Sequence, residues 1–178
     1  AAQRLDAIYQ MPFLAHAAME PMNCTVQLQK DRCDIWVGTQ APTITQSQVA
    51  ELTGLPRDAI KIHNHLIGGG FGRRLEPDGT ILAVKIAKHV DGPVKVIWSR
   101  EEDIQHDMYR PYYLDRLSAG LDRGGKPVAW THRIAGSSIM ARYYPAYVKD
   151  GLDPDAVEAA AEPPYALANI HVDFVRVE

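Results

Sequence analysis

The sequence lacks long apolar runs and a strong excess of charge, and each absence excludes a class of protein. No stretch of about 18 consecutive apolar residues occurs, so no transmembrane helix is predicted. The first residues lack the basic and apolar regions of a signal peptide, although a sequence that begins without Met leaves open what precedes it. The formal net charge of -3 indicates neither nucleic acid nor an anionic membrane as a partner.

Cysteine is also scarce, and Cys24 and Cys33 are the only two. They flank a predicted hairpin, so a disulfide between them is one alternative, and buried thiols are the default. Together with His63 and His65 they would supply four zinc ligands. Neither pair has the spacing of a structural zinc site, so no metal ligand is predicted.

The most distinctive segment is 63–74, HNHLIGGGFGRR, yet it lacks the spacing of common nucleotide-binding loops. In a dinucleotide fingerprint that starts at Gly68 or Gly70, the third glycine would fall on Arg73 or Leu75. No Gly-Lys-Ser/Thr follows, so the segment is not a P-loop. The usual modes of binding NAD and ATP are therefore excluded.

The composition of this segment nevertheless favours a binding site over a plain turn between strands. Glycine reaches positive φ without steric cost and lets backbone N–H groups approach a ligand. Successive exposed N–H groups form a concavity for an anion or an oxo group, and arginines add forked donors. An aromatic residue and two arginines accompany the glycines here, namely Phe71, Arg73 and Arg74, and they favour a binding site over a simple turn.

Alternating and helical patterns predict an α+β (mixed α/β) fold of hairpin-rich sheets with helices packed on them. Strands are predicted at 25–29, 34–38, 60–67, 94–98, 112–121, 128–135 and 170–177, the last without a partner. Helices are predicted at 43–53, from Thr80 to about residue 90, and after Asp153, with 136–164 otherwise irregular. No internal boundary is evident, so 1–178 is treated as one partial domain.

Residue spacing also predicts which side chains cap and bury the first two helices. A capping box of Thr43 and Gln46 would begin the first helix, with Thr80 as the cap of the second. The apolar positions expected to face the core are Ile44, Val49 and Leu52 in the first helix and Leu82, Ile86 and Val90 in the second.

Three polar residues upstream of the glycines allow a structural or a functional role. His63 and His65 lie two apart on one face of a predicted strand, where satisfied structural histidines are favoured over ligands. Glu20 follows a run of small apolar residues. Those surroundings favour a buried, hydrogen-bonded carboxylate over a solvated turn residue.

Three motifs together resemble the molybdenum-binding large subunit of the xanthine oxidase and aldehyde oxidase family. They are HAAMEP at 16–21, WVGTQ at 36–40 and GGGFG at 68–72. A weaker fourth match is REED at 100–103, followed by Arg110. The branch that the sequence most resembles contains isoquinoline 1-oxidoreductase β subunits and related bacterial aldehyde dehydrogenases.

The resemblance implies a role for each matched position. Gln40 would hydrogen-bond an oxo ligand of molybdenum, and backbone N–H groups around Phe71 and Gly72 would contact the metal's oxo ligand and the pterin. Arg110 would lie near the substrate pocket. The implied cofactor-binding residues are Gln40, Gly69, Gly70, Phe71, Gly72 and Arg73. The family's catalytic glutamate lies further towards the C-terminus, so no catalytic residue is assigned here and the isolated fragment is expected to be inactive.

One departure from the family bears on the substrate. Xanthine oxidase-like members have Gly-Lys-Glu after the loop, and the Glu binds purine; here those positions are Arg73, Arg74 and Leu75. Glu76 lies one residue after the position of the purine-binding glutamate. This argues against xanthine and for an aromatic N-heterocycle or an aldehyde.

The resemblance also implies a cofactor, partners and a compartment. The cofactor would be molybdopterin, alone or as its cytosine dinucleotide, in the full-length enzyme and not in the fragment. Partners would be an iron–sulfur small subunit, the remainder of the large subunit and a small-molecule substrate, without nucleic acid. Export of related proteins favours the periplasm over the cytoplasm. The alternative function is a non-catalytic subunit-docking or phosphate-binding module.

Overall fold

The computed structural model describes residues 1–177, which form two compact units. The first unit comprises Ala1–Leu14 and the chain from Arg110 onward, and the second comprises Ala15–Tyr109. The second unit is thus inserted between the first strand of the first unit and its other strands. No glycine-rich or charged linker marks either boundary in the sequence.

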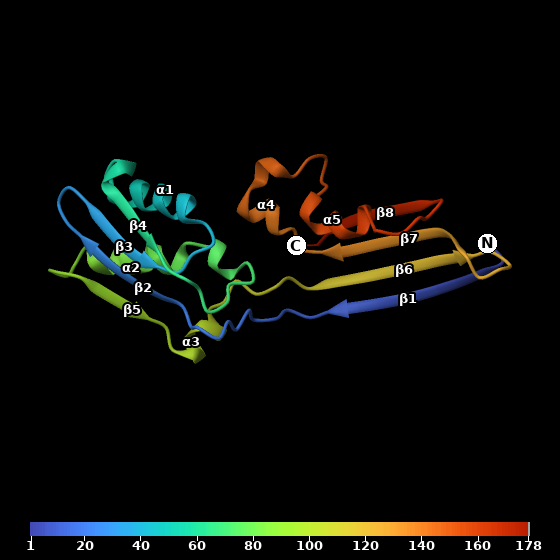
Figure 1. Ribbon diagram of the computed structural model, residues 1–178, viewed down its shortest axis with the longest axis horizontal. Coiled ribbons are helices and arrows are strands. Elements are labelled where there is room, and N and C mark those ends of the chain that lie inside the picture. The colour runs from blue at the N-terminus through green and yellow to red at the C-terminus, as the bar shows by residue number, and fades with distance from the viewer. Residues whose placement is uncertain (178) are drawn as a thin grey trace. The chain divides into compact units, whose positions relative to one another are not determined.

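The first unit is built on a four-stranded sheet with the order β1-β6-β7-β8 (Figure 1). Its strands are β1 (Gln3–Met11), β6 (Tyr113–Leu121), β7 (Pro127–Gly136) and β8 (Ile170–Arg176). The pairs β1–β6 and β6–β7 are antiparallel, whereas β7–β8 is parallel. The predicted hairpin of β6 and β7 is confirmed, and the prediction of an unpaired last strand is wrong.

A helical crossover explains why β8 can lie parallel to β7. Parallel strands begin at the same end of a sheet, so the connection must carry the chain back from the end of β7 to the end at which β7 began. It contains α4 (Ile139–Tyr143), a 3₁₀ turn (Pro145–Tyr147) and α5 (Pro154–Ala161), so 136–164 is more regular than predicted. The predicted start of α5 is confirmed: the buried Asp153 carboxylate accepts the N–H groups of Asp155 and Ala156.

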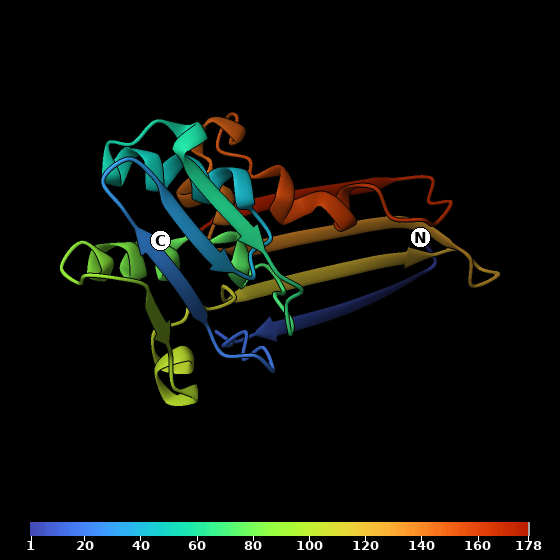
Figure 2. The ribbon, with the colours of Figure 1, turned by 60° about the vertical axis from the view of Figure 1, so that its left-hand side comes forward.

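The second unit has a four-stranded sheet with the order β4-β3-β2-β5 (Figure 2). Its elements are β2 (Asn23–Leu28), β3 (Cys33–Val37), α1 (Pro42–Thr53), β4 (Ile60–Asn64), α2 (Asp78–Ala87), β5 (Val94–Ile97) and α3 (Arg100–Gln105). The β2–β3 hairpin is confirmed, and β4 lies parallel to β3 after the crossover through α1. These elements position the loop of 65–77 directly after β4.

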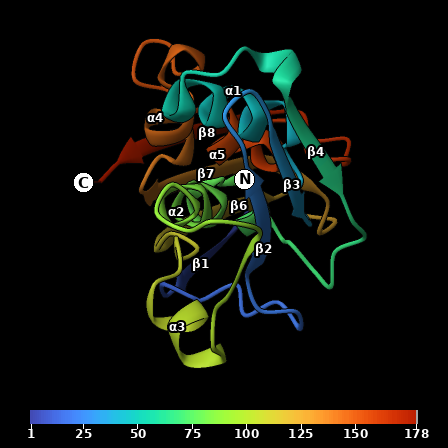
Figure 3. The same ribbon diagram turned by 90° about the vertical axis from the view of Figure 1, so that its left-hand side faces the viewer.

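Alternation along the strands places the core on one face of this sheet, under α1 and α2 (Figure 3). Strand residues of this core include Cys24, Val26, Cys33, Ile35, Val37 and Ile60, which pack with Val49, Ala83, Val84 and Ala87 of the helices. On the other face, His63 stacks on Trp36 with ring centroids 4.7 Å apart, and its Nε2 lies 2.9 Å from Asp34 Oδ1. His63 is therefore a structural histidine, whereas His65 lies beyond the strand and is exposed.

The predicted helix caps and faces are only partly right. Ala41 caps α1 without a side-chain bond, and the Gln46 side chain instead donates to the carbonyls of Arg57 and Ile60. In α1, Val49 is buried but Ile44 is exposed. Leu82, Ile86 and Val90 are all exposed, because α2 turns its small residues towards the sheet. Thr80 is buried within α2 and does not cap it.

Cys24 and Cys33 are buried, and the structure contains no disulfide between them. Burial raises the pKa of each thiol to about 11, so both stay protonated near neutral pH. The default expectation of buried thiols is confirmed. Within residues 1–177, the structure contains no helix with the length and apolar character needed to cross a membrane.

Candidate functional site

The glycine loop presents a row of backbone donors. Gly69, Phe71 and Gly72 have φ values of 100°, 54° and 95°, a left-handed conformation that favours glycine and strains phenylalanine. In the described part of the chain, the N–H groups of Gly69, Gly70 and Phe71 donate to no protein acceptor. These three consecutive groups have no acceptor in the protein; Phe71 is exposed, Gly69 is half-buried and Gly70 is buried against Gln40.

Two side chains accept hydrogen bonds from the N–H groups on either side of this row. Glu20 Oε2 accepts from Gly68 N at 2.7 Å, and Gln40 Oε1 accepts from Gly72 N at 3.1 Å. Gln40 follows β3 and is exposed, and its amide NH₂ donates to no acceptor within residues 1–177. The amide oxygen thus holds the loop while the amide nitrogen stays available beside it.

Gly70 lets Gln40 lie this close to the loop. A Cβ on Gly70 would lie 2.9 Å from Cδ of Gln40 and closer still to its Oε1. Real Cβ atoms do not approach other atoms so closely. A side chain at Gly70 would displace the Gln40 amide from its present position, and the structure brings these two predicted site residues together.

Arg74 is the residue that joins the three sequence motifs. Its side chain is 2% exposed, and it donates from Nε to the Gly69 carbonyl at 2.9 Å. The two Nη groups donate to the carbonyls of Gly38 at 3.2 Å and Glu20 at 2.8 Å. One buried guanidinium therefore fixes the HAAMEP, WVGTQ and GGGFG segments against one another.

The backbone of Arg74 adds to this connection. Its carbonyl accepts the Gln40 N–H at 2.9 Å and the Thr39 hydroxyl at 3.0 Å. The sequence analysis interpreted Arg74 as a donor to a ligand, whereas the structure shows it bonded to the protein's own carbonyl groups. No sequence signal distinguishes it from Arg73, which is buried against carboxylates.

Arg73, predicted to contact the cofactor, is occupied by carboxylates. It is 8% exposed, and its Nη groups form a forked pair with Asp78, both distances being 2.8 Å. Its Nε lies 2.7 Å from Asp107 Oδ1 without hydrogen-bond alignment. Burial opposes its charge, but Asp78 and Asp107 outweigh burial and raise the pKa of Arg73. Contact between its side chain and a cofactor stays a prediction.

Glu20 is hydrogen-bonded and partly buried, as its surroundings in the sequence indicated. Besides the Gly68 N–H, it accepts the Asn23 amide at 2.8 Å and lies 3.2 Å from Arg74 Nη2. Burial alone would raise its pKa, but the Gly68 and Asn23 hydrogen bonds and the Arg74 charge lower it overall. The carboxylate is thus stabilised in its charged form.

This charge makes the stability of the second unit dependent on pH. Because the folded pKa lies below the ordinary value of 4.5, the stabilisation is complete above that value and is lost as the pH falls through the folded pKa. We expect Glu20→Gln to lower the melting temperature at pH 7 and to flatten its decrease between about pH 5 and pH 3. Thermal unfolding at several pH values measures this, and a parallel curve for the variant would contradict it.

The fourth motif has a structural role. Arg100 donates to the carbonyls of Ala18 at 2.6 Å and Met19 at 2.9 Å, and it pairs with Asp103 at 3.0 Å. Asp103 in turn accepts the Met22 N–H. A cavity of about 10 Å³ lies beside this segment, with room for roughly one water molecule. The candidate site, called the wall below, is the surface of the second unit formed by the glycine loop and Gln40.

Arg110 is not brought together with the other predicted residues by any contact within its unit. It belongs to the first unit, whereas Gln40 and the glycine loop belong to the second. Its backbone pairs with that of Leu14, with an N–O distance of 2.9 Å, and the residue is exposed. Its place in a substrate pocket stays a prediction.

The chemistry of the wall fits an oxo-rich group held by hydrogen bonds. The available groups are donors: three backbone N–H groups and one amide. No cluster of three or more His, Cys, Asp or Glu residues among 1–177 could hold a metal ion directly. Phe71 is 62% exposed, so an aromatic ring also lies open beside the donors.

Comparison with known proteins gives an independent test. The family described as "Molybdopterin cofactor-binding domain" matches residues 1–178. Isoquinoline 1-oxidoreductase subunit beta of Brevundimonas diminuta is 38% identical over 144 residues, which cover 80% of this chain and 18% of the relative. The aldehyde oxidoreductase molybdenum-binding subunit PaoC of Escherichia coli (strain K12) is 29% identical over 172 residues, which cover 96% of this chain and 22% of the relative.

The fold agrees with this relationship. Aldehyde oxidoreductase from Desulfovibrio gigas superposes with a TM-score of 0.76 at 16% identity, covering 98% of this chain and 19% of that chain. The chain thus spans about a fifth of the length of these relatives. The predicted α+β fold class is confirmed. The chain belongs to the molybdopterin cofactor-binding domain family, within the molybdenum-binding xanthine oxidase family.

Proposed function

We propose that the protein containing this chain is a molybdenum hydroxylase that oxidises an aromatic N-heterocycle or an aldehyde, with water as the oxygen source. The names of the relatives support this substrate range, since one is an isoquinoline oxidoreductase and another an aldehyde oxidoreductase. Leu75 at the position of the purine-binding glutamate supports the exclusion of xanthine.

The observation that carries the proposal is the row of unused donors beside Gln40. The N–H groups of Gly69, Gly70 and Phe71 and the Gln40 amide offer hydrogen bonds to an electron-rich oxo group without reacting themselves. When bound, the molybdenum cofactor supplies the electron acceptor for the substrate. The residues of this chain hold and orient that cofactor, and they include no assigned general base.

The remaining parts of the enzyme are also proposed. The pterin would carry a cytosine dinucleotide, and it would not stay bound to residues 1–178 alone because the rest of its pocket lies outside them. The remainder of the large subunit would supply the base, and an iron–sulfur subunit would carry the electrons away. Arg110 would orient the substrate, and the periplasm is the proposed compartment.

Replacing Gln40 tests the proposal in the full-length, cofactor-loaded enzyme. We expect Gln40→Ala to lower turnover about a hundredfold, the usual effect of removing one preorganised donor. Molybdenum content and melting temperature should stay close to wild type. Gln48→Ala, an exposed glutamine on α1, is the matched control.

Two results would count against this assignment. Unchanged turnover in Gln40→Ala would remove Gln40 from the site. Absence of both molybdenum and pterin from a well-folded full-length protein would overturn the function itself.

A further inference from the structure

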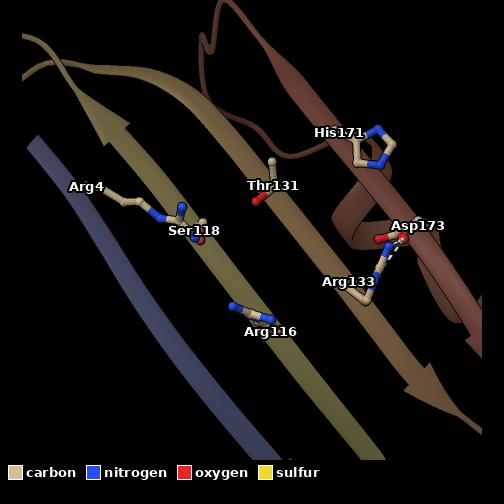
Figure 4. Close-up of a pocket in the computed structure, with 7 residues that line it drawn as sticks. All are labelled: Arg4, Arg116, Ser118, Thr131, Arg133, His171 and Asp173. Carbon is tan, nitrogen blue, oxygen red and sulfur yellow. Dashed lines mark hydrogen bonds and ion pairs between the residues drawn. The ribbon is translucent and has the colours of Figure 1, made fainter. Parts of the chain in front are cut away.

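The first unit contains a hollow on the face of its sheet that carries no core. Ile134 and Asp115 are buried on the face towards α5, and the hollow lies on the opposite face. It has a volume of about 190 Å³ and is lined from all four strands, β1, β6, β7 and β8 (Figure 4). Its lining is polar and rich in arginine, and the sequence motifs do not include it.

Strand register concentrates positive charge in this hollow. Arg116 of β6 stands directly opposite Arg133 of β7, and Thr131 of β7 stands opposite Ser118 and His171 on its two sides. Asp173 forms an ion pair with Arg133, so the charge left without an ion-pair partner at this register position is that of Arg116, which an anion in the hollow would neutralise.

Among residues 1–177, the acids of this face form ion pairs with the other two arginines, whereas Arg116 acts on Asp6 only through its charge, which helps to lower the pKa of that carboxyl group. Asp6 pairs with Arg4 at 2.7 Å, and Asp173 accepts from Arg133 Nε at 2.7 Å. These arginines lower the pKa of both carboxyl groups. Across residues 1–177, the Arg116 side chain makes neither a hydrogen bond nor an ion pair.

We propose that this hollow binds a small phosphate-type oxyanion, with Arg116 and Thr131 as its donors. The guanidinium fork matches two oxygens of a tetrahedral oxyanion, and the Thr131 hydroxyl can donate to a third. Arg133, held in place by Asp173, adds positive charge across from Arg116. The site is separate from the glycine loop, which belongs to the other unit.

Calorimetric titration of the purified protein with inorganic phosphate at low ionic strength tests this proposal. We expect saturable binding that Arg116→Gln weakens about tenfold or more, since a charge-assisted hydrogen bond is lost. Arg123→Gln, in the exposed turn between β6 and β7, is the matched control and should bind as wild type does. Phosphate should also raise the melting temperature of wild type but not of Arg116→Gln.

The proposal is overturned if wild type binds no phosphate, or if Arg123→Gln weakens binding as much as Arg116→Gln does. Competition by chloride at the same concentration would also overturn it, because the effect would then be one of general charge. If Arg116→Gln does not fold, Thr131→Val decides the question. That variant keeps every arginine, and unchanged phosphate binding would then refute the site.

Discussion

Arg74→Ala is expected to lower the free energy of unfolding of the second unit by about 3 to 5 kcal/mol. The truncation leaves the carbonyls of Gly38, Glu20 and Gly69 without their donor in a buried place. It also removes the cation that lies 3.2 Å from the Glu20 carboxylate. Few single truncations combine lost hydrogen bonds with an uncompensated partly buried charge, which is why the expected loss is large.

Urea unfolding followed by tryptophan fluorescence measures this loss in a Trp130→Phe background, because Trp36 and Trp98 lie in the second unit and Trp130 in the first. Arg74→Lys should fall between wild type and Arg74→Ala, since an ammonium group keeps the charge but cannot reach three carbonyls in a fork. Arg57→Ala is the control, an exposed arginine of the same unit. A loss in Arg74→Ala no larger than in this control would refute the role of Arg74.

Gly70→Ala is expected to lower turnover as much as Gln40→Ala does. Its Cβ would overlap the Gln40 side-chain amide, so the amide must move away from the Gly72 N–H. Displacing a positioned donor by about 1 Å can reduce turnover about a hundredfold. In the full-length, cofactor-loaded enzyme we expect this reduction with folding largely retained, because Gln40 is exposed and can adjust.

A double-mutant cycle separates the clash from a general disturbance of the loop. In a Gln40→Ala background the overlap is gone, so adding Gly70→Ala should have little further effect on turnover. Gly72→Ala is a useful contrast: its Cβ would meet no atom within 4 Å, but its φ of 95° strains any side chain. Additive losses for Gly70 and Gln40 would contradict the proposed contact.

Much of the order of the elements from β2 onward follows from local sequence, whereas β1 was not predicted. Hairpins at 29–32 and 122–126, the Gly54 end of α1 and the Asp153 start of α5 all depend on residues near them in the chain. The alternation of Cys33, Ile35 and Val37 likewise predicts a strand with one buried face. A local pattern also identifies the glycine loop as a candidate for the site, whereas Gln40 was a candidate only through the family resemblance.

Tertiary structure decided which of the possible partners each residue meets. The spacing of Leu82, Ile86 and Val90 indicates a helix, but the sheet packs against the smaller residues on another face of it. Helical periodicity is the same for every face, so sequence cannot choose among them without knowledge of the packing. The pairing of β8 with β7 depends in the same way on a crossover that local patterns do not reveal.

The site shows the same division between what sequence determined and what the fold decided. The glycine-rich loop indicated backbone donors because such a loop exposes its N–H groups, and the resemblance to the family added Gln40. Only the folded chain shows that Arg74 connects these segments, since its partners Glu20 and Gly38 are 54 and 36 residues away in sequence. Hydrogen bonds over such separations depend on how the strands pack, and no local pattern encodes that packing.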